Sequence, residues 1–160
     1  MVDCVILGGG NIGDVQSRLC DAERIITERI GEVVSRSKWY STEAWGFESS
    51  DNFTNVAWVV RTDLAATEVL EHLLEIEVLL GRNRRQEYCN KVLNCQSYAN
   101  RVIDLDILLY GSEVVVSPHL QIPHPRLLER DFAVIPMCDA MGIGVDEGKE
   151  FVINIVKNEI

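Results

Sequence analysis

The sequence has few basic residues for its acidic content. Among its 160 residues, Lys and Arg total 15 while Asp and Glu total 25, so the formal net charge is −10. This surplus of negative charge argues against general binding to nucleic acid or to an anionic membrane surface. The chain also lacks any run of 18 apolar residues, and its first residues carry no basic leader. We therefore expect neither a transmembrane helix nor a signal peptide.

Regularly spaced cysteines are missing as well. The five cysteines are odd in number and widely scattered, and no Cys-x-x-Cys motif occurs. This usage is typical of reduced thiols and not of a disulfide framework. We therefore expect a cytoplasmic protein.

Length and composition favour one globular domain over residues 1–160. Hydrophobic residues make up 47% of the chain and charged residues 25%, which is ordinary for a soluble globular fold. Hydrophobic patterning predicts strands at 2–7, 33–42, 53–61 and 101–110 and helices at 15–30 and up to 80. We expect Asp14 to cap the first helix and Thr62 or Asp63 to cap the second. The order β-α-β-β-α-β predicts an α+β fold with a ferredoxin-like core, its helices on one face of an antiparallel sheet, followed by a C-terminal extension.

Two further segments have less regular patterns. Residues 82–100 are polar and lack periodicity, which predicts a loop of 19 residues. Loops of that length in a compact domain are usually functional or disordered, or the assignment is mistaken. The apolar segments 132–137 and 151–156 predict short helical turns packed on the sheet.

Asp104 and Asp106 interrupt the otherwise apolar run of residues 102–109. On a strand, residues i and i+2 point to the same face, with their Cα atoms roughly 6.6 Å apart. Two neighbouring carboxylates repel each other, so a cation between them is expected, and Mg²⁺ suits one or two carboxylates plus substrate phosphates. Two alternatives stay open: this face is exposed to solvent at the sheet edge, or each aspartate pairs with an arginine.

Glu77 stands where the apolar row of the second helix, set by Val69 and Leu73, calls for an apolar side chain. Either this carboxylate reaches a ligand in the protein interior, or it marks the solvent-exposed edge of the apolar row.

Basic residues bracket the 82–100 segment and end beside the aspartate pair. Arginine forks match phosphate oxygens, so this cluster next to metal carboxylates favours phosphoryl-type transfer, with a solvated surface loop as the alternative. The cluster consists of Arg82, Arg84, Arg85, Lys91 and Arg101.

Polar and aromatic residues elsewhere suggest ligand contacts. His124 lies between two prolines in a loop that ends at Arg130. The prolines restrict the backbone and can present both side chains rigidly, although a single histidine in a loop is often incidental.

The Gly8–Gly10 run matches no nucleotide-binding motif and is typical of a tight turn. Aromatic residues and an amide gather near one loop and suit a flat heteroaromatic ligand, with core packing as the alternative. These residues are Trp45, Phe47, Phe53 and Asn55.

Two stretches carry specific motifs. Residues 101–110 read Arg-Val-Ile-Asp-Leu-Asp-Ile-Leu-Leu-Tyr, and residues 122–127 read Ile-Pro-His-Pro-Arg-Leu and run on to an Arg-Asp-Phe triplet at 130–132. The first resembles the Arg-x-x-Asp-(Leu/Ile)-Asp-(Ile/Leu)-Leu-Leu-(Tyr/Phe) signature of the 6-hydroxymethyl-7,8-dihydropterin pyrophosphokinase family, and the second resembles a further motif of that family. Shorter similarities at 10–14, 40–46, 53–55 and 76–82 extend the resemblance over residues 4–137 in a consistent order.

The resemblance implies a folate-biosynthesis enzyme that transfers the β,γ-diphosphate of ATP to the hydroxymethyl oxygen of the pterin, releases AMP and uses two Mg²⁺ ions. It implies metal-binding aspartates at Asp104 and Asp106, and catalytic arginines on mobile loops at Arg82 and Arg101. The implied nucleotide-site residues are Glu77, Arg84, Ile107, His124 and Arg130. The implied pterin-site residues are Thr42, Trp45, Phe53, Asn55 and Phe132. The expected partners are these two small molecules alone, bound by a monomer.

The sequence departs from the family pattern at several positions. The segment before Arg101 is longer than in compact members, and the tryptophan often found there has no clear counterpart. Tyr98 is the nearest candidate, and we assign it to the nucleotide site on that basis. Two other functions remain as alternatives: a binding module without chemistry, and an RNA-recognition domain. The second would require basic character that this chain lacks.

Overall fold

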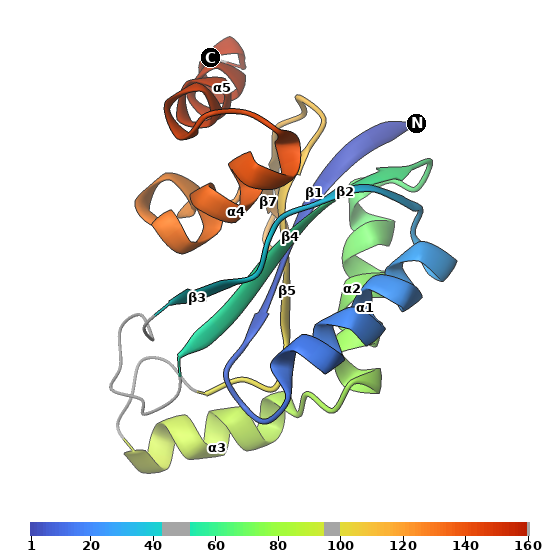
Figure 1. Ribbon diagram of the computed structural model, residues 1–160, viewed down its shortest axis with the longest axis vertical. Helices are drawn as coiled ribbons and strands as arrows, with labels where there is room; N and C mark the ends of the chain where they lie inside the picture. The colour runs from blue at the N-terminus through green and yellow to red at the C-terminus, as the bar shows by residue number, and fades with distance from the viewer. Residues whose placement is uncertain (43–51, 95–99, 160) are drawn as a thin grey trace.

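The computed structural model describes residues 1–42, 52–94 and 100–159. Its centre is a five-stranded antiparallel sheet with the strand order β2-β4-β1-β5, in which β3 also pairs with β4. The fold is therefore a mixed α+β fold, as the sequence predicts (Figure 1). The strands are β1 (Val2–Gly10), β2 (Glu32–Arg36), β3 (Tyr40–Thr42), β4 (Phe53–Thr62) and β5 (Asp104–Tyr110).

The central strand β1 is buried on both faces. Cys4 and Ile6 point into one hydrophobic core, whereas Val5 and Leu7 point into a second core on the opposite side of the sheet. Two-sided burial explains why this strand reads as an unbroken apolar run without alternation. Helices must therefore cover both faces of the sheet.

The first face is covered by α1 (Val15–Arg29) and α2 (Ala66–Leu79). The predicted cap of α1 is confirmed, because the Asp14 carboxylate accepts a hydrogen bond from the Ser17 N–H at 3.1 Å.

The start of α2 differs from the prediction. The Glu68 carboxylate accepts a hydrogen bond from the Ala65 N–H at 2.7 Å, immediately before the first turn. The Thr62 hydroxyl instead donates to the Ile30 carbonyl at 2.6 Å. Neither Thr62 nor Asp63 caps the helix, because Thr62 belongs to the end of β4.

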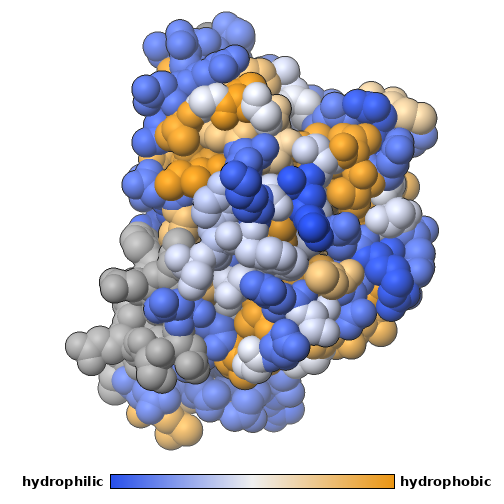
Figure 2. All heavy atoms as spheres, in the orientation of Figure 1, coloured by the Kyte–Doolittle hydropathy of each residue, from blue (hydrophilic) through white to orange (hydrophobic). Residues whose placement is uncertain are grey.

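The second face is covered by α4 (Asp131–Met141), and α5 (Val145–Asn158) packs on α4 (Figure 1). The two helices of the predicted β-α-β-β-α-β order thus lie on one face, as expected, and the C-terminal extension covers the other face. The predicted helical turns at 132–137 and 151–156 extend into helices of 11 and 14 residues. Buried Ala133, Val134 and Met137 supply the apolar stripe that this face of the sheet requires. Figure 2 shows exposed hydrophobic residues at the end of the molecule where α4 and α5 lie. Phe151 of α5 is among the exposed hydrophobic residues.

The strand predicted at 33–42 divides into β2 and β3. Between them, the Ser37 hydroxyl accepts a hydrogen bond from the Ala57 N–H at 2.9 Å and donates to the Lys38 carbonyl at 2.7 Å. A side chain thus replaces a main-chain partner in the ladder and interrupts the regular pairing with β4.

The Asp139 side chain links α4 to the segment between β2 and β3. Its carboxylate accepts hydrogen bonds from the Lys38 N–H at 2.8 Å and from the Tyr40 hydroxyl at 3.0 Å. The Lys38 main-chain hydrogen bond, with the Tyr40 bond and the Lys38 charge, holds the pKa of Asp139 below its ordinary value. A lowered pKa in the folded state stabilises the fold above the unfolded pKa, and this contribution is lost as the pH falls.

We expect Asp139→Ala to lower the free energy of unfolding by about 1–2 kcal/mol at pH 7. The difference from the unsubstituted protein should narrow as the pH falls below about 4, where the unfolded chain takes up a proton before the folded carboxylate does. Urea titrations at several pH values measure both effects. The exposed Asp21 of α1 offers the control, because Asp21→Ala should show little loss. A pH-independent deficit for Asp139→Ala would contradict the ion-linked explanation.

Residues 82–100, predicted as a loop, contain helix α3 (Arg84–Asn94). The Asn83 side chain caps it by accepting a hydrogen bond from the Gln86 N–H at 3.0 Å. No residue of α3 is buried, so it carries no core-facing stripe from which periodicity could have been recognised. The remaining elements are β6 (Val115–Val116), β7 (Gln121–Ile122) and the 3-10 turn Leu127–Glu129. Among the described helices, none has the length and apolar character needed to cross a membrane.

Candidate active site

Asp104 and Asp106 lie on β5 and face the α4 side of the sheet. The neighbouring residues Leu105 and Ile107 are buried in the α1–α2 core, so strand alternation directs the two aspartates to the opposite face. In the register with β1, Asp104 lies beside Gly9 and Asp106 beside Leu7. β5 is an edge strand of the sheet, and both carboxylates are partly exposed, so the alternative of a solvent-exposed face at the sheet edge holds in part.

A row of residues crosses the sheet at Gly9. Its main chain pairs with Asn55 on β4 and with Asp104 on β5. Directly paired residues of antiparallel strands share a face, so Asn55 and Asp104 look to the same side, about 10 Å apart across two strand spacings. A Cβ at Gly9 would collide with the Asn55 side chain. The glycine therefore keeps open the space between an amide and a carboxylate.

Arginines hold the Asp104 carboxylate. Arg101 Nη1 donates to Asp104 Oδ2 at 2.7 Å, and Arg82 Nη1 donates to Asp104 Oδ1 at 2.9 Å. The alternative of arginine pairing thus holds for Asp104. Within the described residues, no ion pair joins Asp106 to an arginine.

The two aspartates differ in pKa. Burial acts to raise the pKa of Asp104, but the Arg101 and Arg82 guanidiniums outweigh it and hold the pKa below its usual range. Burial, followed by the charge of Asp104, raises the pKa of Asp106 to about 8. Asp106 therefore favours its protonated form near neutral pH until a cation approaches.

Glu77 of α2 lies beneath this cluster and is 2% exposed. Its Oε1 accepts a hydrogen bond from the Leu105 N–H at 2.8 Å, and its Oε2 accepts one from Arg84 Nη2 at 2.7 Å. Oε1 also forms an ion pair with Arg82, 2.9 Å from Nη1. Burial raises the pKa of Glu77, and the Arg82 charge opposes that rise. Glu77 is therefore not at a solvent-exposed edge of α2. Its side chain links α2 to β5 and contacts Arg82 and Arg84.

A second group approaches from the loop before α4. The His124 N–H donates to the Leu108 carbonyl of β5 at 3.0 Å, which ties the loop to the strand of the two aspartates. Arg130 lies over the Phe132 ring at 5.6 Å from its centroid. Burial, followed by the charge of Arg130, lowers the pKa of His124, so its imidazole is neutral at pH 7. An imidazole, a guanidinium and a ring thus gather beside the carboxylates.

Comparison with known proteins identifies the family of this site. Residues 5–142 match the family described as 7,8-dihydro-6-hydroxymethylpterin-pyrophosphokinase. The chain belongs to this family. It is 37% identical over 132 residues to the 2-amino-4-hydroxy-6-hydroxymethyldihydropteridine pyrophosphokinase of Porphyromonas gingivalis, covering 82% of this chain and 85% of that protein. It is 36% identical over 136 residues to the enzyme of the same name from Aquifex aeolicus, covering 84% and 78%.

Solved structures show the same fold. A crystal structure of Plasmodium falciparum HPPK-DHPS with pteroate superposes with a TM-score of 0.69 at 11% identity and covers 99% of this chain. The chain spans 46% of the length of that bifunctional protein. An HPPK-DHPS structure in complex with substrates gives a TM-score of 0.64 at 13% identity.

The structure brings most of the predicted family residues to one end of the sheet. Phe53 and Asn55 share the face of the aspartates, and the main chain of Thr42 pairs with Phe53. The Ile107 side chain is an exception, because it is buried in the α1–α2 core and leaves only main-chain groups for a ligand. Trp45 and Tyr98 lie outside the described residues.

The sequence analysis did not assign to the candidate site three residues that contact its predicted members: Gly9, Glu87 and Asn11. Buried Asn11 accepts a hydrogen bond from the Arg101 N–H at 2.8 Å and donates to the Asn100 side chain at 2.8 Å. It thereby fixes the main chain that carries a predicted catalytic arginine. The available signals were the Gly8–Gly10 run, which is typical of a tight turn, and the family similarity at 10–14, which assigned no role to Asn11.

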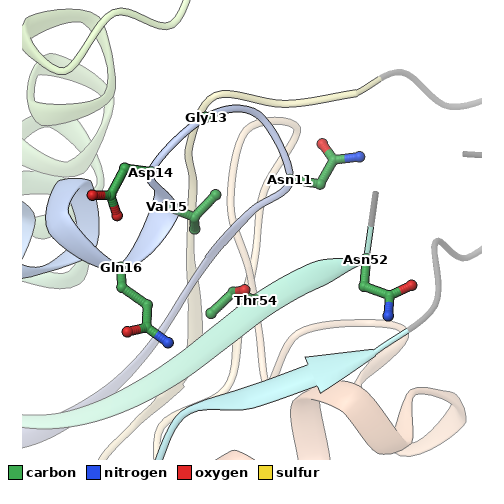
Figure 3. Close-up of a pocket in the computed structure, with 7 residues that line it drawn as sticks. All are labelled: Asn11, Gly13, Asp14, Val15, Gln16, Asn52 and Thr54. Carbon is green, nitrogen blue, oxygen red and sulfur yellow. The ribbon is translucent and has the colours of Figure 1, made fainter. Parts of the chain in front are cut away.

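A hollow of about 610 Å³ opens near the end of β1 (Figure 3). Thr54 contributes to its wall, and strand alternation places Thr54 on the face opposite to Asn55. The Thr54 wall of the hollow therefore faces away from Asn55 and the two carboxylates, whereas Asn11 links the hollow to the main chain of Arg101. Its lining residues are Asn11, Gly13, Asp14, Val15, Gln16, Asn52 and Thr54.

Proposed function

We propose that this chain is a magnesium-dependent pyrophosphokinase that transfers the β,γ-diphosphate of ATP to the hydroxymethyl oxygen of 6-hydroxymethyl-7,8-dihydropterin. The products are AMP and the pterin diphosphate, an intermediate of folate biosynthesis. The observation that carries the proposal is the row Asn55–Gly9–Asp104, with Asp106 on the same face. On this face the Asn55 amide can form hydrogen bonds with the edge of a heteroaromatic ring. The Asp104 and Asp106 carboxylates, across Gly9 from it, are suited to bind a cation.

Two Mg²⁺ ions fit the chemistry of Asp104 and Asp106. Oxygen donors are the ligands that Mg²⁺ takes, and the pKa of about 8 for Asp106 reflects buried negative charge that a cation would neutralise. Bound there, the ions would neutralise phosphate charge and align the β-phosphorus with the attacking oxygen. In the described part of the chain, no group of three or more His, Cys, Asp and Glu side chains is placed to hold a metal. Two carboxylates suffice where water and phosphates complete the coordination shell.

The neighbouring side chains have complementary roles in the proposal. Arg82 and Arg101 neutralise phosphate charge during transfer and move from Asp104 to do so. Arg84, His124 and Arg130 bind the nucleotide, with Glu77 holding Arg84 in place, while Tyr98 and the Ile107 main chain complete that site. Phe53 and Phe132 contact the pterin faces, and Asn55 bonds its edge, with Thr42 and Trp45 nearby.

The same proposal covers the organisation of the chain. We propose one pyrophosphokinase domain with a ferredoxin-like core, which the strand order β2-β4-β1-β5 supports. A monomer is sufficient because all proposed site residues belong to one chain. A cytoplasmic location is consistent with four free cysteines in the described residues. Sedimentation analysis measures the oligomeric state.

Incubation with ATP, Mg²⁺ and the reduced pterin tests the function. We expect stoichiometric AMP and pterin diphosphate, and no AMP when the pterin is omitted or EDTA is added. Formation of ADP in place of AMP, or no product although calorimetry shows that both ligands bind, would refute the proposal.

Gly9→Ala tests the pterin end separately. Its Cβ displaces the Asn55 side chain, so we expect about tenfold weaker pterin binding, equivalent to loss of one good hydrogen bond. Nucleotide binding should change little. Gly144→Ala is the matched control, because nothing lies within 4 Å of the added Cβ. Equal pterin affinity in both variants, measured by calorimetry, would show that Gly9 does not border the pterin site.

A further inference from the structure

Arg82 is enclosed by three carboxylates. Its Nη1 donates to Asp104 at 2.9 Å and lies 2.9 Å from Glu77, while Nε and Nη2 donate to the two oxygens of Glu87 at 3.0 and 3.2 Å. The side chain is 3% exposed. An arginine presents five N–H donors, so these contacts use most of its capacity. In this arrangement the guanidinium has little left for a phosphate.

Glu87 contributes most to this enclosure. It forms a two-point pair, the geometry in which a carboxylate binds a guanidinium most firmly. A phosphate oxygen pair would need the same fork of donors. Glu87 and a substrate phosphate therefore compete for the same two nitrogens of Arg82.

Glu87 is also the least firmly anchored of the three carboxylates. Glu77 is fixed by the Leu105 N–H on the buried side of α2, and Asp104 belongs to β5. Glu87 lies on α3, which has no buried residue and exposes Tyr88, Val92 and Leu93. Departure of Glu87 with α3 costs little apolar burial, so it is the contact that can be exchanged.

We propose that Glu87 is a positioning residue that holds Arg82 away from the nucleotide site and yields it to phosphate, so that the Glu87–Arg82 pair lowers nucleotide affinity and returns the arginine after transfer. The inference rests on the proposed role of Arg82 in binding the transferred phosphates. It assigns to the first turn of α3 a function that neither Asp104 nor Glu77 performs.

The test is a double-substitution cycle on nucleotide binding. We expect Glu87→Gln to bind a non-hydrolysable ATP analogue with Mg²⁺ about tenfold more tightly than the unsubstituted protein. In an Arg82→Ala background, Glu87→Gln should change affinity less than twofold, because the competition no longer exists. Glu113→Gln, at an exposed site after β5, controls for the loss of one negative charge. Glu87→Asp keeps the negative charge but shortens the side chain that pairs with Arg82. Its affinity for the ATP analogue should lie between those of Glu87→Gln and the unsubstituted protein.

Steady-state kinetics provide the second measurement. Release of product becomes slower when Arg82 stays on phosphate, so Glu87→Gln should lower KM for ATP and kcat together. Weaker binding, or an equal gain in the Arg82→Ala background, would overturn the inference, since a structural or purely electrostatic role gives those results. The binding cycle does not require turnover, so absence of AMP refutes the proposed function without deciding this one.

Discussion

Asp106→Asn should reduce turnover at least a hundredfold, the order expected when a principal charge-stabilising group is removed, while the protein stays folded. The amide keeps the size of the side chain but supplies a weak ligand to a cation in place of a carboxylate. Rates of AMP formation at saturating ATP and pterin measure the loss, and circular dichroism checks the fold. Asp21→Asn, on the exposed surface of α1, is the matched control and should retain full turnover. Unchanged turnover in Asp106→Asn would remove Asp106 from the proposed metal site.

The same substitution should change the pH dependence of stability. Burial and the charge of Asp104 raise the pKa of Asp106 to about 8, above the value of 3.8 for an unperturbed aspartate. Between these values the folded protein retains a proton that the unfolded chain releases, so Asp106 lowers stability as the pH rises from 4 to 8. Asparagine carries no such penalty.

We therefore expect Asp106→Asn to gain in unfolding free energy relative to wild type when the pH is raised from 5 to 8 in EDTA. Excess Mg²⁺ should reduce this gain, because a bound cation stabilises the ionised carboxylate of the wild-type protein. Urea titrations at both pH values, with and without Mg²⁺, measure the difference. A constant difference between the two proteins would mean that Asp106 is ionised in the folded state throughout.

The aspartate pair could be predicted because it depends on the simplest structural period. Alternation along a strand is enough to put Asp104 and Asp106 on one face, and the apolar residues around them identify that strand as largely buried. The same rule places Phe53 and Asn55 together on β4. Which face of the sheet they share, and that α4 covers it, depends on packing between distant segments.

Other features escaped the sequence analysis for physical reasons. Helix α3 buries no residue, so its hydrophobic pattern carries no signal, and only the Asn83 cap marks its start. The partners of Arg82 could not be predicted either. Glu87 is the one acid within its segment, whereas Glu77 comes from α2 and Asp104 from β5, so tertiary structure brings these partners to Arg82. The collision that makes Gly9 necessary involves Asn55, which lies 46 positions away in the sequence.

Arg82 and Arg101 are expected to respond alike in activity and differently in stability. Both donate to Asp104 in this structure. In the proposed function both move from it to neutralise phosphate charge, so replacement of either by alanine should lower turnover at least a hundredfold. Arg82 is 3% exposed and also neutralises Glu77, which is 2% exposed. Removing one member of a buried ion pair leaves uncompensated charge, so Arg82→Ala should lower the unfolding free energy by about 3–5 kcal/mol.

Arg101 is 29% exposed, and its pairing with Asp104 is partly screened by water. We expect Arg101→Ala to cost about 1 kcal/mol or less. Arg82→Lys provides the control for charge, since it should recover part of the stability but little of the turnover, because an ammonium cannot reproduce the fork. Urea unfolding and AMP formation, measured on the same preparations, separate the two properties. Equal destabilisation by the two alanine substitutions would mean that burial does not distinguish these arginines.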